Sequence, residues 1–236
     1  MEPTSSGRRP ENRPAGRPVS RQVLADHVYG ELLASLMDGR LEPGATVSID
    51  GTARELDVSP TPVREALARL EHTGMVRRVA LKGYRVAPVF TQEDFAELME
   101  ARLAIEPVNA RLACARLTPQ NLAELGQAVA DLKKAPRGPS FAEYRAYLEA
   151  DERFHRLIAE FTGNQFMVAA YAALGGQVQR FRLFGGVGIT DAEHAISEHQ
   201  SVLDALSSGD PDEAADAMAD HVRKVRGRAI ADAPEA

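Results

Sequence analysis

The second half of the chain is divided by helix-capping signals into six amphipathic segments, and this division is the strongest constraint on its fold. From Thr91 onward, Ser, Thr, Asn or Asp residues recur at positions suited to an N-cap, most of them followed by an acidic residue or a proline. No strand pattern interrupts these segments. The pattern predicts a mainly α chain with an all-α, six-helix antiparallel bundle over residues 90–232, its helices near 91–116, 118–134, 140–162, 164–184, 190–208 and 210–230.

The preceding region, residues 20–89, predicts a smaller domain of three helices and a hairpin. Helices are expected near 20–38 and 51–56, and a third begins at Ser59, a suitable N-cap, with Pro60 at its first position and Gly74 beyond its end. The residues after Gly74 alternate loosely and turn at Lys82 and Gly83, which indicates a two-stranded hairpin. Three helices followed by a hairpin form the winged helix-turn-helix arrangement.

The third helix of such a domain enters the major groove of DNA. Its apolar stripe contains Val63 and Leu67, and Thr61 and Arg64 lie on the opposite face, near the N-terminal end. Arginine can contact guanine through two hydrogen bonds, and the hydroxyls of Ser59 and Thr61 can hold phosphates. The same spacing also fits a small structural helix with a solvent-facing arginine.

Charge and composition limit the class of protein. Residues 1–90 hold 13 Lys and Arg against 11 Asp and Glu, a net of +2, whereas the rest hold 15 against 23, a net of −8. Residues 1–19 are rich in arginine and proline and predict a disordered basic arm, either a phosphate-binding arm or a solvated tail. Cys114 is the single cysteine, and no segment resembles a signal peptide or a membrane span, so we expect a cytoplasmic protein.

Four of the six predicted helices carry polar side chains on rows that are otherwise apolar. Burying such groups without partners costs several kcal/mol, so they should contact one another or a bound group. One aspartate and three histidines form an N₃O set suited to a divalent transition metal, with zinc expected first and nickel or manganese as alternatives. The inward polar residues are Arg102, Asn109, Asp151, His155, His199 and His221.

The charges of this set predict the ligand. A dication beside Asp151 leaves one positive charge and Arg102 adds a second, so the site should favour a small carboxylate that touches both metal and guanidinium. Asn109 could bind the ligand's remaining oxygens or make a structural bond between helices. Arg182 could line the rim of the site or be exposed to solvent.

Two parts of the sequence resemble one family of regulators. The segment ARELDVSPTPVREALARLEHTGMV, followed by KGYRV, resembles the DNA-binding domain of GntR-type transcriptional regulators. The segments EARLAIEPVNARLACARL, EADERFHRLI, SEHQSVLDAL and MADHV resemble the FadR-like branch, whose helical ligand domain is called FCD. The resemblance covers residues 20–230, and 44 and then 22 residues separate the three histidines.

The resemblance implies a homodimer that binds a pseudo-palindromic operator on double-stranded DNA, usually as a repressor, and responds to a metabolite. The family's metal ligands correspond to Asp151, His155, His199 and His221, and its effector-carboxylate arginine corresponds to Arg102. Its DNA-contacting positions correspond to Ser59, Thr61 and Arg64, and its wing tip to Lys82 and Gly83. Pro60 and Asp50 stand where members often carry DNA-binding arginines.

Three functions fit these residues. The leading hypothesis is a metal-containing transcriptional repressor controlled by a carboxylate. A helical metalloenzyme is the second, disfavoured because the apolar rows show no second inward carboxylate to act as a general base. A metal-sensing regulator is the third, and the inward Arg102 argues against it.

Overall fold

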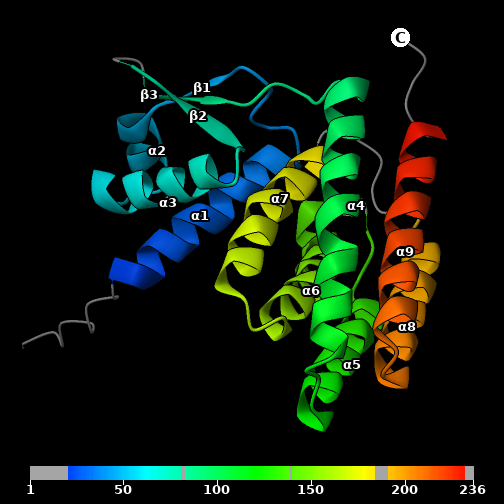
Figure 1. Ribbon diagram of the computed structural model, residues 1–236. Helices are drawn as coiled ribbons and strands as arrows, with labels where there is room; N and C mark the ends of the chain where they lie inside the picture. Colours follow the sequence, from blue (N-terminus) through cyan, green and yellow to red (C-terminus); the bar gives the residue numbers. More distant parts are fainter. Residues whose placement is uncertain (1–20, 81–82, 139, 184–190, 232–236) are drawn as a thin grey trace, which may run out of the picture.

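The computed structural model describes residues 21–80, 83–138, 140–183 and 191–231. Its N-terminal part consists of three helices and a small sheet, drawn in blue and cyan in Figure 1. The elements are α1 (Arg21–Met37), β1 (Thr46–Val47), α2 (Ile49–Glu55), α3 (Pro60–His72), β2 (Val76–Val79) and β3 (Gly83–Val86). The predicted basic arm, residues 1–19, lies outside the described residues.

Local sequence explains where α2 and α3 begin. Ser48 caps α2, because its hydroxyl accepts a hydrogen bond from the Gly51 amide at 3.1 Å. Pro60 opens α3, where the missing amide hydrogen removes no helical bond. The predicted stripe of α3 is buried against α1, and Val63 and Leu67 are fully inaccessible.

The wing is a three-stranded sheet of order β1-β3-β2, so the predicted two-stranded hairpin is incomplete. Thr46 pairs with Arg85 and Val47 with Tyr84, because Val47 and Tyr84 both bury their side chains in the domain core. Gly83 has φ +84°, and a Cβ atom there would lie 3.2 Å from the Val47 carbonyl oxygen. Lys82 lies outside the described residues.

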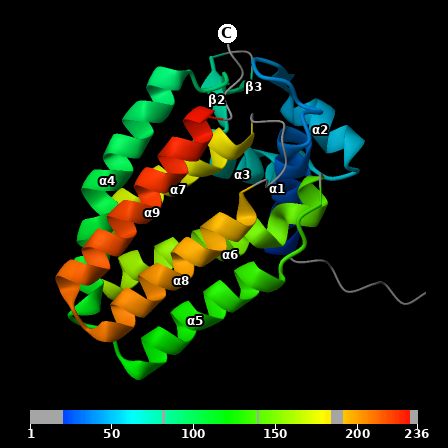
Figure 2. The same ribbon diagram turned by 90° about the vertical axis from the view of Figure 1, so that its right-hand side faces the viewer.

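The C-terminal part is the predicted bundle of long helices, and each described helix ends within two residues of its expected bounds. Capping boxes begin three of them, at Thr91, Thr118 and Ser140. The helix α6 packs against α4, α5 and α7, and α9 lies along α4 and α8 (Figure 2). The helices are α4 (Gln92–Cys114), α5 (Pro119–Lys134), α6 (Phe141–Phe161), α7 (Gln165–Leu183), α8 (Ala192–Ser208) and α9 (Pro211–Ala231).

The two parts share one hydrophobic cluster. Leu36 of α1 belongs to the same buried cluster as Tyr147 of α6 and Ile196 of α8. The Phe141 amide, at the start of α6, donates to the Asp38 carboxylate at 2.9 Å. A second cluster, which includes Phe154, lies within the helical bundle. Among the described helices, none is long and apolar enough to cross a membrane.

Candidate metal and effector site

Three histidines from three helices converge inside the bundle. His155 comes from α6, His199 from α8 and His221 from α9, and one nitrogen of each lies within 4.8 Å of the other two. All three side chains are buried, with at most 4% of the residue surface exposed. The predicted spacing along the sequence therefore corresponds to one cluster in space.

An oxygen atom lies within 3.0 Å of the Nδ1 atom of each imidazole. The Nδ1 atom of His199 lies 2.6 Å from the Ala195 carbonyl oxygen, and that of His221 lies 3.0 Å from Glu198 Oε2. The Nδ1 atom of His155 lies 2.7 Å from Glu106 Oε2. Because these acceptors place the proton on Nδ1, every Nε2 atom directs a lone pair into the cluster.

The distances between these atoms fit a bound metal. His155 Nε2 and His199 Nε2 are 3.2 Å apart, and Asp151 Oδ1 lies 3.4 Å from His199 Nε2. Bonds of about 2.05 Å in a tetrahedral zinc site separate neighbouring ligand atoms by about 3.3 Å. Two lone pairs at this separation repel each other unless a cation lies between them, so the donor set fits a divalent metal.

Glu106 is a buried carboxylate beside this cluster, and the prediction that no second carboxylate points inward is wrong. Arg102 donates to it twice, from Nε to Oε1 at 2.5 Å and from Nη2 to Oε2 at 3.3 Å. Burial alone would raise the pKa of Glu106, but Arg102 and His155 outweigh burial and hold it well below its ordinary value. Glu106 also neutralises Arg102, so the predicted second positive charge is not available.

Glu198 holds His221 in the same way. Arg228 donates to both of its oxygens, at 2.6 and 3.0 Å, and also to Asp191 at 2.9 Å. Burial would raise the pKa of Glu198, but the bonds from His221 and Arg228 lower it to about 2. Two Arg–Glu–His chains thus support the cluster. The first is buried throughout, and the second reaches an open hollow of about 490 Å³ between α8 and α9.

Burial also favours the neutral forms of His199 and His221, as metal ligation requires. Desolvation, followed by the neighbouring His221, lowers the pKa of His199 to about 3. Desolvation likewise lowers the pKa of His221, and the hydrogen bond to Glu198 only partly opposes it. Neutral imidazoles at ordinary pH leave their Nε2 lone pairs free to bind a cation.

Three of the predicted DNA-contacting residues lie together at the N-terminal end of α3. Ser59 is the N-cap and is exposed, and its hydroxyl makes no capping hydrogen bond. Thr61 is half-buried and Arg64 is exposed. Gly83 begins β3 in the wing sheet.

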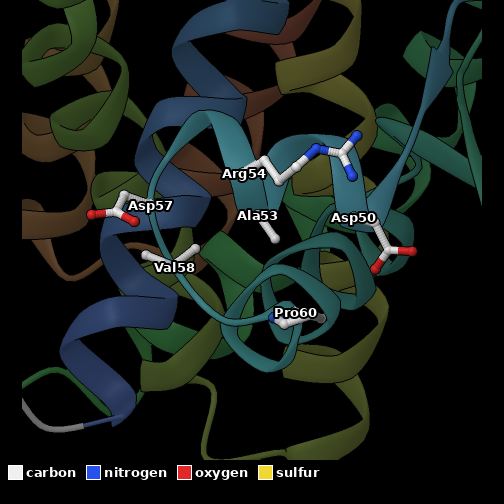
Figure 3. A pocket seen from close by; sticks show the side chains of 6 residues that line it. All are labelled: Asp50, Ala53, Arg54, Asp57, Val58 and Pro60. Carbon is white, nitrogen blue, oxygen red and sulfur yellow. The ribbon is translucent and has the colours of Figure 1, made fainter.

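A shallow hollow of about 420 Å³ lies between α2 and the start of α3 (Figure 3). Asp50 and Pro60, the two departures from the family pattern, both line it, and Arg54 extends from α2 toward the same side as Asp50. Arg54 is the one cation among the six lining residues, which are Asp50, Ala53, Arg54, Asp57, Val58 and Pro60.

Comparison with known proteins agrees with this geometry. A family model described as the FCD domain matches residues 97–224, and one described as bacterial regulatory proteins, gntR family, matches residues 24–86. The chain belongs to the GntR family and carries an FCD domain. Its helical part is therefore the ligand-binding domain of a transcriptional regulator, and the related proteins are regulators, not enzymes.

Two curated relatives are named as repressors. A probable D-xylose utilization operon transcriptional repressor of Paenarthrobacter nicotinovorans is 29% identical over 86% of this chain and 88% of its own length. The HTH-type transcriptional repressor NanR of Cronobacter sakazakii is 27% identical over 89% of this chain and 86% of its own.

A solved structure shares the fold. E. coli McbR/YncC superposes with a TM-score of 0.69 at 23% identity, covering 88% of this chain and 97% of that one. At this level of identity the likeness concerns the fold alone.

Tyr171 and Glu152 of the FCD domain also lie beside the cluster, but the apolar rows of the sequence do not predict a role for them there. Tyr171 falls on a row of α7 that predicts plain core, yet its hydroxyl donates to Glu152 at 2.9 Å. Its ring stacks on His155 with centroids 6.4 Å apart. Burial raises the pKa of Glu152 despite the bond from Tyr171. The spacing of Glu152, three residues before His155, is the sequence signal that locates it.

Asn109 lies on the inward face of α4 with 1% of its surface exposed. Neither its amide nitrogen nor its amide oxygen has a hydrogen-bond partner among the described residues. The alternative prediction, a structural hydrogen bond from Asn109 to another helix, is therefore wrong among the described residues. Arg182 belongs to α7, but its side chain lies outside the described parts.

Proposed function

We propose that this GntR-family chain is a homodimeric transcriptional repressor whose affinity for its operator is controlled by a small carboxylate bound at a divalent metal. The observation that carries the proposal is the convergence of three buried Nε2 lone pairs beside Asp151. The names of its relatives, which include repressors, support the direction of regulation. We expect it to act in the cytoplasm, where the chromosome lies.

Asp151, His155, His199 and His221 would hold the metal, zinc being the first expectation. When bound, the metal supplies a Lewis-acidic point at which an effector carboxylate can attach. Glu106 and Glu198 orient their histidines for this ligation. We assign the other effector contacts to Arg102, which keeps Glu106 in place, to Asn109, whose amide lacks partners among the described residues, and to Arg182 of α7.

The DNA-binding contacts are assigned to the exposed end of α3 and to the wing. Arg64 would read a base edge, while Ser59 and Thr61 would contact phosphates. Lys82 and Gly83 would approach the DNA backbone from the wing. A homodimer presents two such surfaces, which suits a pseudo-palindromic operator.

A direct contact between the two parts supports coupling of effector to DNA. Gln177 of α7 lies against Gly74, two residues beyond the end of α3, so closely that a Cβ atom on Gly74 would lie 2.5 Å from the Gln177 amide nitrogen. The same helix α7 carries Tyr171, whose ring stacks on His155. An effector that shifts α7 can thereby move the recognition helix, and a coupling of about 1–3 kcal/mol is enough to alter operator occupancy.

Metal sensing is the second candidate, because one observation now favours it. Arg102 is neutralised by Glu106, so an inward guanidinium no longer requires an anionic effector. A catalytic function is not supported, because Arg102 and His155 both hold Glu106 in its charged, weakly basic form.

Gel-shift titration with the DNA upstream of the protein's own gene tests the proposal. We expect retardation of that DNA by zinc-loaded protein and its relief by carboxylic acids. Release by zinc alone would favour metal sensing, and an absence of retardation at every salt concentration would refute DNA-binding regulation by this chain. Asp151→Ala and His199→Ala should abolish the response to acids, whereas His27→Ala, at an exposed histidine of α1, should not.

A further inference from the structure

The wing sheet places two arginines directly opposite each other. Arg77 of β2 pairs in register with Arg85 of β3, and Arg85 pairs on its other side with Thr46 of β1. Successive side chains of a strand point to opposite faces of the sheet. Val76 and Val86, which pair one position along, are buried in the domain core, so the two arginines and the threonine form a row on the outer face.

Burial of the core residues fixes this pairing. A shift of one residue would bring the buried side chains of a strand to the solvent face and its arginine to the core. Like charges directly opposite each other on a sheet repel and lower its stability. The strands therefore carry an unfavourable pair that a neutral or acidic residue at either position would remove.

No carboxylate among the described residues compensates the pair. Neither the exposed Arg77 nor the half-buried Arg85 forms an ion pair or a side-chain hydrogen bond within the described parts of the chain. Exposure alone does not explain this, because the exposed Arg111, Arg145 and Arg156 of the bundle each have a carboxylate partner at 2.5 to 2.7 Å. The two guanidiniums are therefore available to an anion from outside the chain.

The position of this row suits the phosphate backbone of DNA. The sheet packs beside α3, the proposed recognition helix, and is drawn above it in Figure 1. Contacts to phosphates supply a large share of the affinity of a protein for DNA. Two such contacts of the family pattern are missing from α2 and α3, because Asp50 and Pro60 stand where members often carry arginines. A basic row on the sheet can supply a replacement.

Resting on the proposed function, we propose that Arg77 and Arg85 together bind one phosphate of the operator backbone, with the Thr46 hydroxyl as a further donor. A guanidinium presents parallel N–H groups that match the oxygens of a phosphate. A phosphate between the two arginines also offsets their repulsion, because each then faces a negative charge. The contact reads no base, so it should strengthen binding to every duplex.

The salt dependence of DNA binding tests this contact. Fluorescence anisotropy measures the affinity of the full chain for the DNA upstream of its gene and for an unrelated duplex, between about 50 and 200 mM salt. The double variant Arg77→Gln/Arg85→Gln should reduce the slope of log affinity against log salt by about 0.9 on both duplexes. This change corresponds to about tenfold weaker binding at about 50 mM salt.

Arg40→Gln/Arg78→Gln is the matched control, because it also removes two positive charges from the same domain. Arg78 lies opposite Tyr84, and Arg40 pairs with Asp38, so neither arginine belongs to the row. This control should keep the salt slope of the unmodified protein. An equal reduction of the slope in both double variants would mean that only the overall charge of the domain acts, and would overturn the shared contact.

Thermal unfolding without DNA tests the repulsion itself. Arg77→Gln should raise the melting temperature by about 1–3 °C at low salt, and Arg77→Glu, which sets an opposite charge against Arg85, should raise it further. Both gains should shrink at about 1 M salt, where charges are screened. Both variants should weaken DNA binding, Arg77→Glu the more strongly. A lower melting temperature in both variants would make the pair a structural feature and contradict the inference.

The outcomes distinguish this inference from the proposed function. If the unmodified protein retards no duplex at any salt concentration, the proposed regulation fails and the phosphate contact fails with it. If the unmodified protein binds DNA and releases it with carboxylic acids, while Arg77→Gln/Arg85→Gln keeps the full salt slope, the row makes no phosphate contact and the repressor proposal stands.

Discussion

Glu106 Oε2 lies 2.7 Å from His155 Nδ1, so a residue of α4 lies against the ring of a proposed metal ligand on α6. Arg102 binds the same carboxylate from the preceding turn of α4. The Arg228–Glu198–His221 chain repeats this order of groups between α9 and α8. We therefore expect the proposed metal site to depend on residues that do not touch the metal, and the first prediction tests this.

Glu106→Ala should weaken zinc binding about 10- to 100-fold, because His155 loses the acceptor that orients it. Competition with a chromogenic chelator measures this affinity. Glu106→Gln retains an oxygen acceptor and should lose less. Equal zinc affinity in the alanine variant and the unmodified protein would show that the histidines are held without Glu106.

Removal of zinc should destabilise the protein. At a free zinc concentration about 100 times Kd, binding contributes about 2.7 kcal/mol, which corresponds to a melting temperature roughly 5–10 °C higher for a chain of this size. Differential scanning fluorimetry with and without a chelator measures the difference. His199→Ala should remove the zinc dependence and His27→Ala should keep it; a chelator that leaves the unmodified protein unchanged would contradict the metal site.

The metal-free protein should lose stability as pH falls below about 6.5. Burial lowers the pKa of His199 to about 3 in the folded state, so between these values the unfolded chain binds a proton that the folded chain does not. Stability therefore falls with decreasing pH, by up to about 1.4 kcal/mol per pH unit for this residue. Denaturant titrations between pH 6.5 and 5 measure the slope. A slope unchanged in His199→Gln would refute this assignment.

The sequence predicts the cluster of proposed metal ligands because these residues interrupt apolar rows. Asp151 and His155 are one turn apart on α6, and the capping signals of each helix place His199 and His221 on inward faces. The helix bounds are predictable for the same reason, since caps are local features. The pattern of three helices and a hairpin predicts the winged domain, and the family resemblance adds the identity of the ligand-binding part.

Glu106 and Glu198 cannot be identified from one helix at a time. A row on α4 can continue from Arg102 to Ile105 or to Glu106, and the apolar choice is Ile105, yet Ile105 is half-buried and Glu106 is buried. Glu198 is buried because His221 and Arg228 of α9 approach it. The third strand β1 has only two residues, and its pairing with β3 is a long-range contact.

Arg64→Ala should weaken specific operator binding by about 1–3 kcal/mol and relax the preference for one base. Arg69→Ala is the matched control on the same helix, because Arg69 is bonded to Asp26 at 2.6 Å and covers the ring of Tyr29. It should leave the sequence preference unchanged. Fluorescence anisotropy with wild-type and single-base-substituted operators measures both effects, and equal losses on every sequence would reduce Arg64 to a phosphate contact.

Gly74→Ala should destabilise the protein and alter the response to effector. Gly74 has φ +73°, a conformation that costs other residues about 1–2 kcal/mol, and the added Cβ would displace Gln177. Gln177→Ala removes the obstacle but not the backbone strain, so the double variant should recover part of the stability. If α7 transmits the effector signal to α3, Gln177→Ala alone should reduce the release of DNA by effector while leaving effector affinity within about threefold. Full release of DNA by effector in this variant would place the coupling elsewhere, such as the cluster shared by α1 and α6.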